Sequence, residues 1–261
     1  MLIARFTLAD QIAYGRVDGD PDDVGSLRVT AIDGHPFAPY ETTSAVFPLS
    51  DVRLLPPVLP SKVVGIGKNY ADHAREMGGE PPATPVMFLK PSTSVVGPGE
   101  SVVLPPQSAQ VEFEGEIAVV IGRLCRDVPT ERAADVILGY TCADDVTARD
   151  LQRADGQWAR AKGFDTFCPL GPWIATELDT GELAVRTTVN GEVRQAGGVA
   201  DLVHPVAELV AFVSSAMTLL PGDVILTGTP AGVGPLADGD EVTVTVAGVG
   251  DLVHRVTGPT E

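Results

Sequence analysis

The chain has 261 residues, 44% of them hydrophobic and 20% charged, so it is long enough to bury a large core and too apolar to be disordered. Eighteen Lys and Arg residues against 35 Asp and Glu residues give a net charge of −17, which repels nucleic acid and anionic membranes. We therefore expect neither as a partner, and an anionic ligand has to meet cationic groups inside a site.

Glycine and proline are abundant, at 28 and 22 residues, which indicates many turns and short strands. We predict a mixed, β-rich α+β fold. Cys125, Cys142 and Cys168 are widely spaced, so we expect reduced thiols and neither disulfides nor a zinc site. The sequence has no signal-peptide pattern at its N-terminus and no run approaching 18 apolar residues, so we expect a soluble cytoplasmic protein.

Residues 1–57 are predicted to form a small N-terminal β-rich domain, in which we find no chemistry. Its expected elements are two strands and a turn, at residues 3–8, 11–16 and 19–23. Pro56, Pro57 and Pro60 predict a stiff connector, so we place the domain boundary there and assign residues 58–261 to a second, larger domain.

A buried strand at residues 62–66 leads into a short helix that carries His73 and Glu76. These two residues are three apart and lie on one helical face, where they can orient a water or move a proton. An ordinary surface contact between a histidine and a glutamate is the alternative. The surrounding glycines and prolines predict a mobile segment, such as a lid over a site.

An acidic strand follows, in which Glu112, Glu114 and Glu116 alternate with apolar residues. Strand periodicity places the three carboxylates on one face, with neighbours about 6.6 Å apart. The alternative is a solvated acidic face. The apolar run at residues 118–121 favours a strand covered on both sides, so the carboxylates approach the interior and need a partner. A hard cation such as Mg²⁺ or Mn²⁺ suits their oxygen atoms.

We predict a helix at residues 129–138 and a strand at residues 139–143 that presents Asp144 and Asp145 at its end. Asp145 is thereby a candidate third oxygen donor, and a helix cap is the alternative for the aspartate pair. Lys162 lies in a loop rich in glycine and proline, where a lone lysine is usually solvated. Further expected elements are a hairpin, a helix, a strand leading into a glycine-rich turn and a second hairpin, at residues 183–195, 205–220, 224–234 and 241–256.

Six motifs, taken together and in order, resemble the fumarylacetoacetate hydrolase superfamily over residues 62–256. They are GKNYADHARE at residues 67–76, FLKPS at 88–92, EGE at 114–116, DDVTARD at 144–150, KGFDTFCPLGP at 162–172 and TGTPAGVG at 227–234. The resemblance implies a catalytic domain with a β-sandwich or roll, preceded by the small N-terminal domain of bacterial members called 2-hydroxyhepta-2,4-diene-1,7-dioate isomerases. It also implies a homodimer.

By this resemblance, Glu114, Glu116 and Asp145 would hold Mg²⁺ or Mn²⁺, and Lys162 would stabilise an enolate beside the metal. Asp144 departs from the pattern, because many members carry asparagine there. This extra carboxylate either competes for the metal or faces water.

The same resemblance makes His73 and Glu76 the acid–base dyad of a lid, and gives Arg149, Gln152 and Thr229 the task of positioning substrate oxygens. The implied substrate is a small 2-oxo acid, a 1,3-dicarbonyl compound or a dicarboxylate. The implied reactions are hydrolysis of a C–C bond in an acylpyruvate or fumarylpyruvate, isomerisation of 2-hydroxyhepta-2,4-diene-1,7-dioate in aromatic-compound catabolism, or decarboxylation of the oxaloacetate type. Two other classes remain open: a metal-binding scaffold without catalysis, which the presence of the dyad and Lys162 disfavours, and a cupin-like barrel, which would need clustered histidines.

Overall fold

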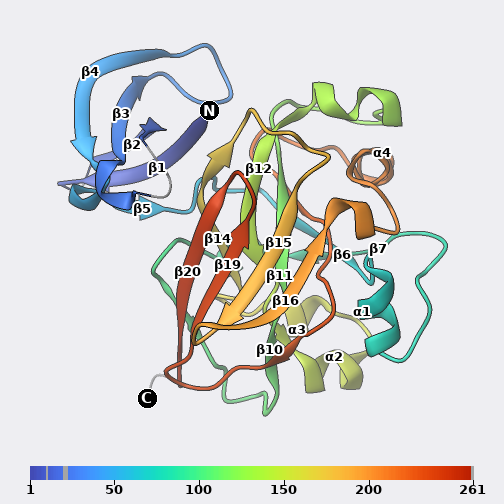
Figure 1. The fold of residues 1–261 in the computed structure, drawn as a ribbon. Helices are drawn as coiled ribbons and strands as arrows, with labels where there is room; N and C mark the ends of the chain where they lie inside the picture. The colour runs from blue at the N-terminus through green and yellow to red at the C-terminus, as the bar shows by residue number, and fades with distance from the viewer. Residues whose placement is uncertain (10, 20–22, 260–261) are drawn as a thin grey trace.

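The computed structural model describes residues 1–9, 11–19 and 23–259 (Figure 1). Strands dominate and the helices are short, which confirms the mixed β-rich fold. The α-helices are α1 (Ala71–Glu76), α2 (Arg149–Asp155), α3 (Ala159–Lys162) and α4 (Val206–Ala216). No helix in the described part of the chain has the length and apolarity needed to span a bilayer. The turn predicted at residues 19–23 includes residues 20–22, which lie outside the described residues.

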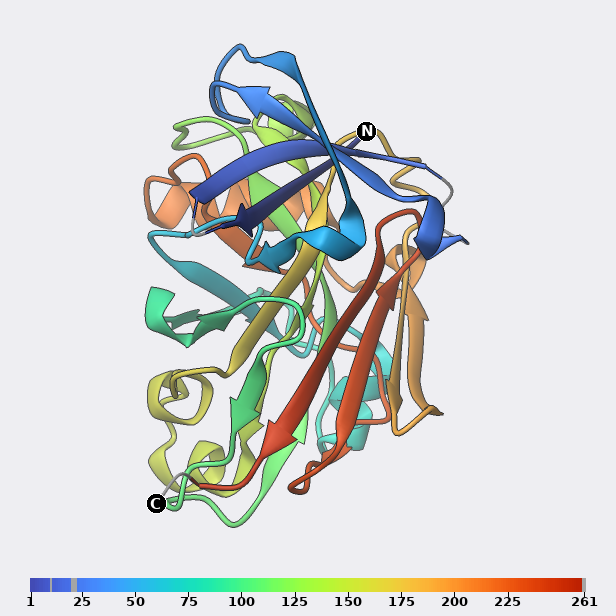
Figure 2. The ribbon, with the colours of Figure 1, turned by 90° about the vertical axis from the view of Figure 1, so that its left-hand side faces the viewer.

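The largest sheet runs from the N-terminal strands at one edge to the strands that precede and follow α1 in the sequence at the other edge (Figures 1 and 2). Its order is β4 (Glu41–Pro48), β3 (Arg28–Asp33), β2 (Gln11–Asp18), β1 (Leu2–Leu8), β14 (Cys168–Ala175), β12 (Ile137–Asp144), β11 (Gly115–Ile121), β17 (Val224–Leu226), β6 (Val63–Gly67) and β7 (Val86–Lys90). Two short strands join it at the side, β5 (Arg53–Leu55) on β1 and β8 (Val95–Val96) on β14. β11 and β12 therefore lie at the centre.

Two smaller sheets complete the fold. One has the order β16 (Glu192–Gly198), β15 (Ala184–Val189), β19 (Glu241–Val246), β20 (Gly250–Thr257) and β9 (Ser101–Val103), and it packs across β11, β12 and β14. The other joins β13 (Thr147–Ala148), β10 (Val111–Phe113) and β18 (Gly234–Pro235). The predicted hairpin at residues 183–195 is confirmed, and its turn places Asn190 and Gly191 at φ values of 51° and 80°.

β11 is buried on both of its faces, as its apolar sequence predicts. Ile117, Val119 and Ile121 point into one hydrophobic core, and Ala118 and Val120 point into a second one. All five are fully buried. Burying a large aliphatic side chain contributes about 1.5–3 kcal/mol, so this strand is a firm support for the acidic residues at its start.

The N-terminal strands extend the largest sheet instead of forming one of their own. β1 pairs antiparallel with β14, where Leu2 lies opposite Ala175 and Ile3 lies opposite Ile174. The division of the chain at residue 57 stays a prediction, because backbone pairing joins the two parts.

Two predicted helices are wrong in kind or length. Residues 129–138 form a 3₁₀ helix only from Thr130 to Asp135, since Ile137 already pairs with Ile121 in the central sheet. The helix predicted at residues 205–220 ends at Ala216 as α4, because Leu219 forms a β-bridge with Cys125. In both places a long-range strand contact prevails over helix propensity.

Candidate active site

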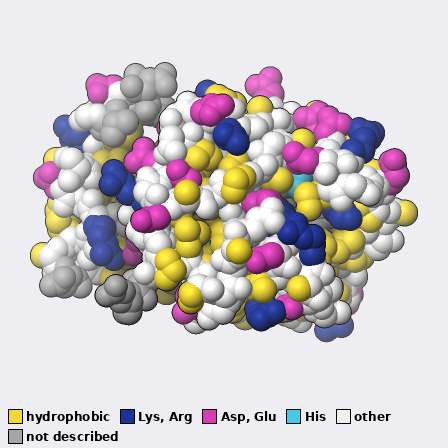
Figure 3. All heavy atoms as spheres, turned by 90° about the horizontal axis from the view of Figure 1, so that it is seen from below, with side chains coloured by type: hydrophobic (Ala, Val, Ile, Leu, Met, Phe, Trp, Pro, Cys, Tyr) yellow, Lys and Arg dark blue, Asp and Glu magenta, His cyan; other side chains and the backbone are white. Residues whose placement is uncertain are grey.

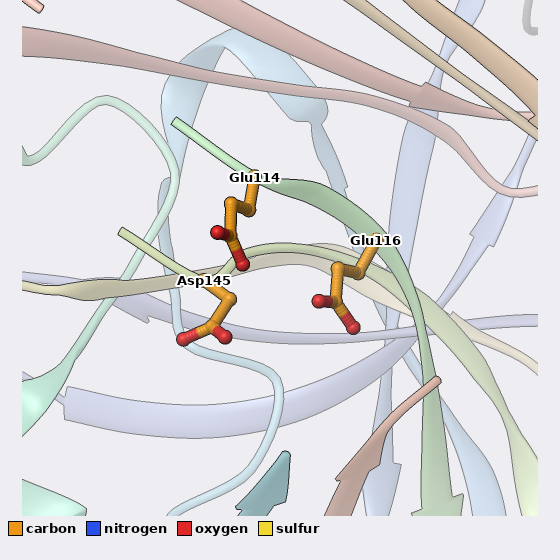
Figure 4. A group of neighbouring side chains, drawn as sticks. All are labelled: Glu114, Glu116 and Asp145. Carbon is orange, nitrogen blue, oxygen red and sulfur yellow. The ribbon is translucent and has the colours of Figure 1, made fainter. Parts of the chain in front are cut away.

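Three buried carboxylates, those of Glu114, Glu116 and Asp145, converge on one another (Figure 4). Glu114 lies between β10 and β11, Glu116 lies on β11, and Asp145 follows the end of β12. Each can offer an oxygen within 4.8 Å of the others, and their exposed fractions are 4%, 2% and 1%. The structure thus brings together the three residues that we predicted as metal ligands.

The backbone around Glu114 explains why the acidic strand is interrupted there. The Glu114 amide donates to Asp144 Oδ1 at 2.8 Å, outside the pattern of the sheet, and the Glu114 carbonyl accepts the Asp145 amide at 2.8 Å. The Gly115 amide donates to Gln195 Oε1 at 3.0 Å. A Cβ at Gly115 would lie 1.9 Å from the Thr187 hydroxyl oxygen, so the Glu-Gly-Glu spacing needs glycine at its centre.

Asp144 corrects a prediction, because its carboxylate neither faces water nor joins the three converging carboxylates. It is fully buried on the other side of β12 and accepts a hydrogen bond from the Glu114 amide. Its second oxygen lies 2.8 Å from Nε2 of the buried His254, on β20. Asp144 therefore holds the backbone of Glu114, a role that its place beside Asp145 in the sequence did not reveal.

Lysines surround Asp145. Lys162 Nζ, at the end of α3, lies 2.7 Å from Glu114 Oε2 and 2.5 Å from Asp145 Oδ2. Lys90 Nζ, at the end of β7, lies 2.5 Å from Asp145 Oδ1. Both side chains are almost wholly buried, so Lys162 is not the solvated lysine that its loop sequence suggested.

Arg149, the first residue of α2, joins two of the glutamates. Its Nε donates to Glu112 Oε2 at 2.7 Å and its Nη2 donates to Glu114 Oε1 at 2.5 Å. Its Nη1 donates to Gln152 Oε1 at 2.7 Å. All three nitrogens of the guanidinium are thus engaged by this chain, and Gln152 keeps its amide nitrogen for other partners.

The charge balance of this cluster is short by one positive charge. Its four buried carboxylates belong to Glu112, Glu114, Glu116 and Asp145. Its three buried cationic groups belong to Lys90, Arg149 and Lys162. Burial, Asp145 and Glu114 raise the pKa of Glu116 well above its usual value. For Glu114, burial opposes ionisation, but Lys162 and Arg149 prevail and lower its pKa. Burial likewise opposes the charge on Lys162, yet Asp145 and Glu114 raise its pKa.

These residues fit a hard divalent cation. The donors are three carboxylates with no cysteine or histidine among them, which is the ligand chemistry of Mg²⁺ and Mn²⁺. The missing positive charge, expressed in the raised pKa of Glu116, is what a bound cation would supply. Glu112 is held by Arg149 and stays outside the donor set.

The predicted dyad lies on α1, where His73 Nδ1 is 3.2 Å from Glu76 Oε2. His73 is 5% exposed, whereas Glu76 reaches toward solvent. The Gly232 amide donates to both oxygens of Glu76, at 3.1 and 3.2 Å, so the glycine-rich turn after β17 anchors the pair. The mobility of this segment stays a prediction.

One pocket collects most of the predicted site. It is lined by Ile66, Gly67, Lys68, His73, Met77, Glu114, Glu116, Arg149, Gln152, Trp158, Lys162 and Thr229. Seven of the nine predicted site residues are among them. The other two lie just behind the lining: Asp145 contacts Lys162, and Glu76 contacts His73. Thr229 donates through its hydroxyl to the Gly115 carbonyl at 2.9 Å and accepts from Gln195 Nε2 at 2.6 Å.

Sequence reasoning missed the far wall of this pocket. The Trp158 ring packs on the Phe88 ring with centroids 5.4 Å apart, and Lys162 Nζ lies 4.9 Å from the centre of the Phe88 ring. A Cβ at Gly67 would lie 2.5 Å from the Trp158 ring. Gly67 and Phe88 belong to recognisable motifs, but nothing in the sequence relates either of them to Trp158.

Comparisons with known proteins agree along the whole chain. The family model described as fumarylacetoacetate (FAA) hydrolase C-terminal matches residues 62–257, and the one described as Rv2993c-like, N-terminal matches residues 1–57. Protein Rv2993c of Mycobacterium tuberculosis is 52% identical over 259 residues, which is 98% of each chain. A crystal structure of 2-hydroxyhepta-2,4-diene-1,7-dioate isomerase from Mycobacterium marinum is 49% identical, with a TM-score of 0.94 and 100% of both chains covered. Human mitochondrial oxaloacetate tautomerase FAHD2A is 45% identical over 224 residues, covering 81% of this chain and 71% of the human one.

Proposed function

The chain belongs to the fumarylacetoacetate hydrolase family, and we propose that it is a divalent-metal-dependent enzyme that converts 2-oxo acids through an enolate. One observation carries this proposal. Glu114, Glu116, Lys162 and His73 line a single pocket, and the third buried carboxylate, that of Asp145, lies directly behind Glu114 and Lys162. A cation site, a fixed positive charge and a proton carrier are the parts that enolate chemistry requires.

The roles follow from the positions. A divalent cation held by Glu114, Glu116 and Asp145 would polarise the 2-oxo group of the substrate when bound. Lys162 lies beside these carboxylates and would stabilise the negative charge that develops on the substrate oxygen. Its burial strengthens that interaction, since water does not screen it.

His73 would transfer the proton. Its Nδ1 faces Glu76, which leaves Nε2 as the ring nitrogen that can exchange a proton with substrate. Glu76, itself fixed by the Gly232 amide, orients the imidazole. Proton removal at the carbon beside the 2-oxo group and return at another atom amounts to isomerisation or tautomerisation.

Isomerisation is the best supported outcome. Two relatives that align over most of this chain are named for such reactions, one as a 2-hydroxyhepta-2,4-diene-1,7-dioate isomerase and one as an oxaloacetate tautomerase. Hydrolysis of a C–C bond in an acylpyruvate is the second candidate, favoured by a His73–Glu76 pair that can deprotonate a water as well as a carbon. Decarboxylation of oxaloacetate would pass through the same enolate.

A panel of substrates tests the proposal. Purified protein with Mg²⁺, with Mn²⁺ or with a chelator is incubated with oxaloacetate, an acylpyruvate and 2-hydroxyhepta-2,4-diene-1,7-dioate, and products are identified by NMR. We expect metal-dependent turnover of at least one of them, with loss of the enol signal faster than in the protein-free control. Metal binding without any metal-dependent turnover would make this chain a metal-binding scaffold and refute the proposal. Absence of metal binding would refute it as well.

A further inference from the structure

Lys68 is a pocket residue without a role in the chemistry above. It follows β6 and lines the pocket together with His73 and Met77. Its amino group lies close to the loop after α1, because a Cβ placed on Gly79 would be 3.5 Å from Lys68 Nζ. Lys68 thus extends toward this loop, whereas the amino group of Lys162 is buried against Glu114 and Asp145.

Lys68 also differs from the other cationic side chains of the pocket in its partners. Lys162 is paired with Glu114 and Asp145, and Arg149 is paired with Glu112 and Glu114. Among the described residues, Lys68 is part of no ion pair and its side chain makes no hydrogen bond. In a chain of net charge −17, a half-buried lysine that lines a pocket and has no carboxylate partner is available for an anionic ligand.

The backbone holds Lys68 in an unusual conformation. Its φ is +57°, in the left-handed region that residues other than glycine rarely adopt. The next residue, Asn69, fixes this turn, since its side chain donates to the carbonyls of His204 and Thr227 at 3.0 and 2.8 Å and accepts the His204 amide at 2.8 Å. Backbone strain that neighbouring contacts enforce is commonly found at ligand sites.

We propose that Lys68 binds the distal carboxylate of the substrate, and so makes the enzyme selective for dicarboxylic 2-oxo acids over monocarboxylic ones. This inference rests on the proposed function, which places the 2-oxo end of the substrate at Glu114, Glu116 and Asp145. The charge of Arg149 is already paired with Glu112 and Glu114, so a second substrate carboxylate finds a cationic group without a carboxylate partner in Lys68. A charge-assisted hydrogen bond at a half-exposed site corresponds to about a tenfold difference in affinity.

Two ligands that differ only at their distal end test this selectivity. We would measure the Kd of 2-oxopentanedioate and 2-oxopentanoate for the Mg²⁺-loaded protein by calorimetry, in the wild type and in three variants. We expect the wild type to prefer the dicarboxylate by about tenfold at low salt, and less at high salt. Lys68→Met should abolish this preference by weakening the dicarboxylate alone, and Lys68→Arg should keep most of it.

Arg75→Met is the matched control, because it removes one positive charge from the same segment. Arg75 lies on α1, is paired with Asp72 and does not line the pocket, so the preference should remain. If Lys68→Met does not fold, Lys68→Asn takes its place, since asparagine tolerates the left-handed backbone. A wild type that binds both ligands equally, or a Lys68→Met variant that keeps the preference, overturns the role of Lys68 and leaves the 2-oxo acid function standing. A wild type that binds neither ligand overturns both.

Discussion

Lys162→Met should weaken the fold, strengthen Mg²⁺ binding and remove most of the activity. Lys162 Nζ contacts Glu114 Oε2 at 2.7 Å and Asp145 Oδ2 at 2.5 Å, with the side chains of all three at most 5% exposed. Removing one partner of a buried ion pair destabilises a protein by about 3–5 kcal/mol, because the remaining charge is left unpaired. For a chain of this length that corresponds to a Tm lower by roughly 6–20 °C in the presence of a chelator.

Mg²⁺ should restore much of this loss. A cation that binds only the folded state adds about 2.7 kcal/mol when its concentration is 100 times its Kd. The variant no longer places an ammonium group against two of the ligands, so the rise in Tm with Mg²⁺ should exceed that of the wild type. Turnover should nevertheless fall about 10²–10³-fold, the range for losing one group that stabilises a developing oxyanion.

The measurements are thermal unfolding in chelator and in Mg²⁺, followed by kcat at a temperature at which every variant is folded. Lys62→Met is the control, because Lys62 forms an ion pair with the buried Asp223 outside the pocket. That control should lose stability without gaining from Mg²⁺ more than the wild type does. An unchanged Tm of Lys162→Met in chelator, or an equal Mg²⁺ response in both lysine variants, would refute this account of the charge cluster.

Three further predictions concern the metal, the dyad and the assembly. Glu116→Ala should lose Mg²⁺ binding in calorimetry. The Mg²⁺ affinity of the wild type should be full above the raised pKa of Glu116 and should fall as the pH drops through it, because the proton competes with the cation. A Mg²⁺ affinity independent of pH would contradict this. His73→Ala should lower kcat roughly 10²–10⁴-fold with little change in Mg²⁺ affinity. Glu76→Gln should lower kcat less, since the imidazole remains. Loss of Mg²⁺ binding with intact turnover per bound metal would instead make His73 a metal ligand. Light scattering at micromolar concentration should give the mass of a homodimer, and the mass of a monomer would contradict it.

Much of the fold could be predicted from local patterns. Alternating apolar residues and turn pairs such as Asn190–Gly191 indicated strands and hairpins that the structure contains. The pairing order could not be predicted, because it depends on contacts between distant segments. β1 lies beside β14 through Leu2 and Ala175, which are separated by more than 170 residues, and no periodicity indicates that register.

The site was predictable to the extent that its residues lie in motifs. The Glu-Gly-Glu alternation placed Glu114 and Glu116 on one side of a strand, and the end of the next predicted strand made Asp145 a candidate third donor. Only the resemblance to a family gave Lys162 a role. The structure brings these four residues together beside one pocket, which Glu114, Glu116 and Lys162 line, while their catalytic roles remain predictions. Lys90 stayed outside the predicted site, because a lysine at a strand end can equally be solvated or neutralise an anion, and its burial against Asp145 depends on the neighbouring β12.

Asp144 and Asp145 show why adjacent identical residues can have opposite roles. Successive side chains of a strand point to opposite faces, so the end of β12 sends Asp145 toward Lys162 and Asp144 toward His254 on the second sheet. Asp144 accepts the Glu114 amide as well, which links His254 to the backbone of a proposed metal ligand. The second sheet thereby supports the proposed metal donors from behind, and the carboxylate that resembled a competitor for the cation instead holds the backbone of one proposed ligand in place.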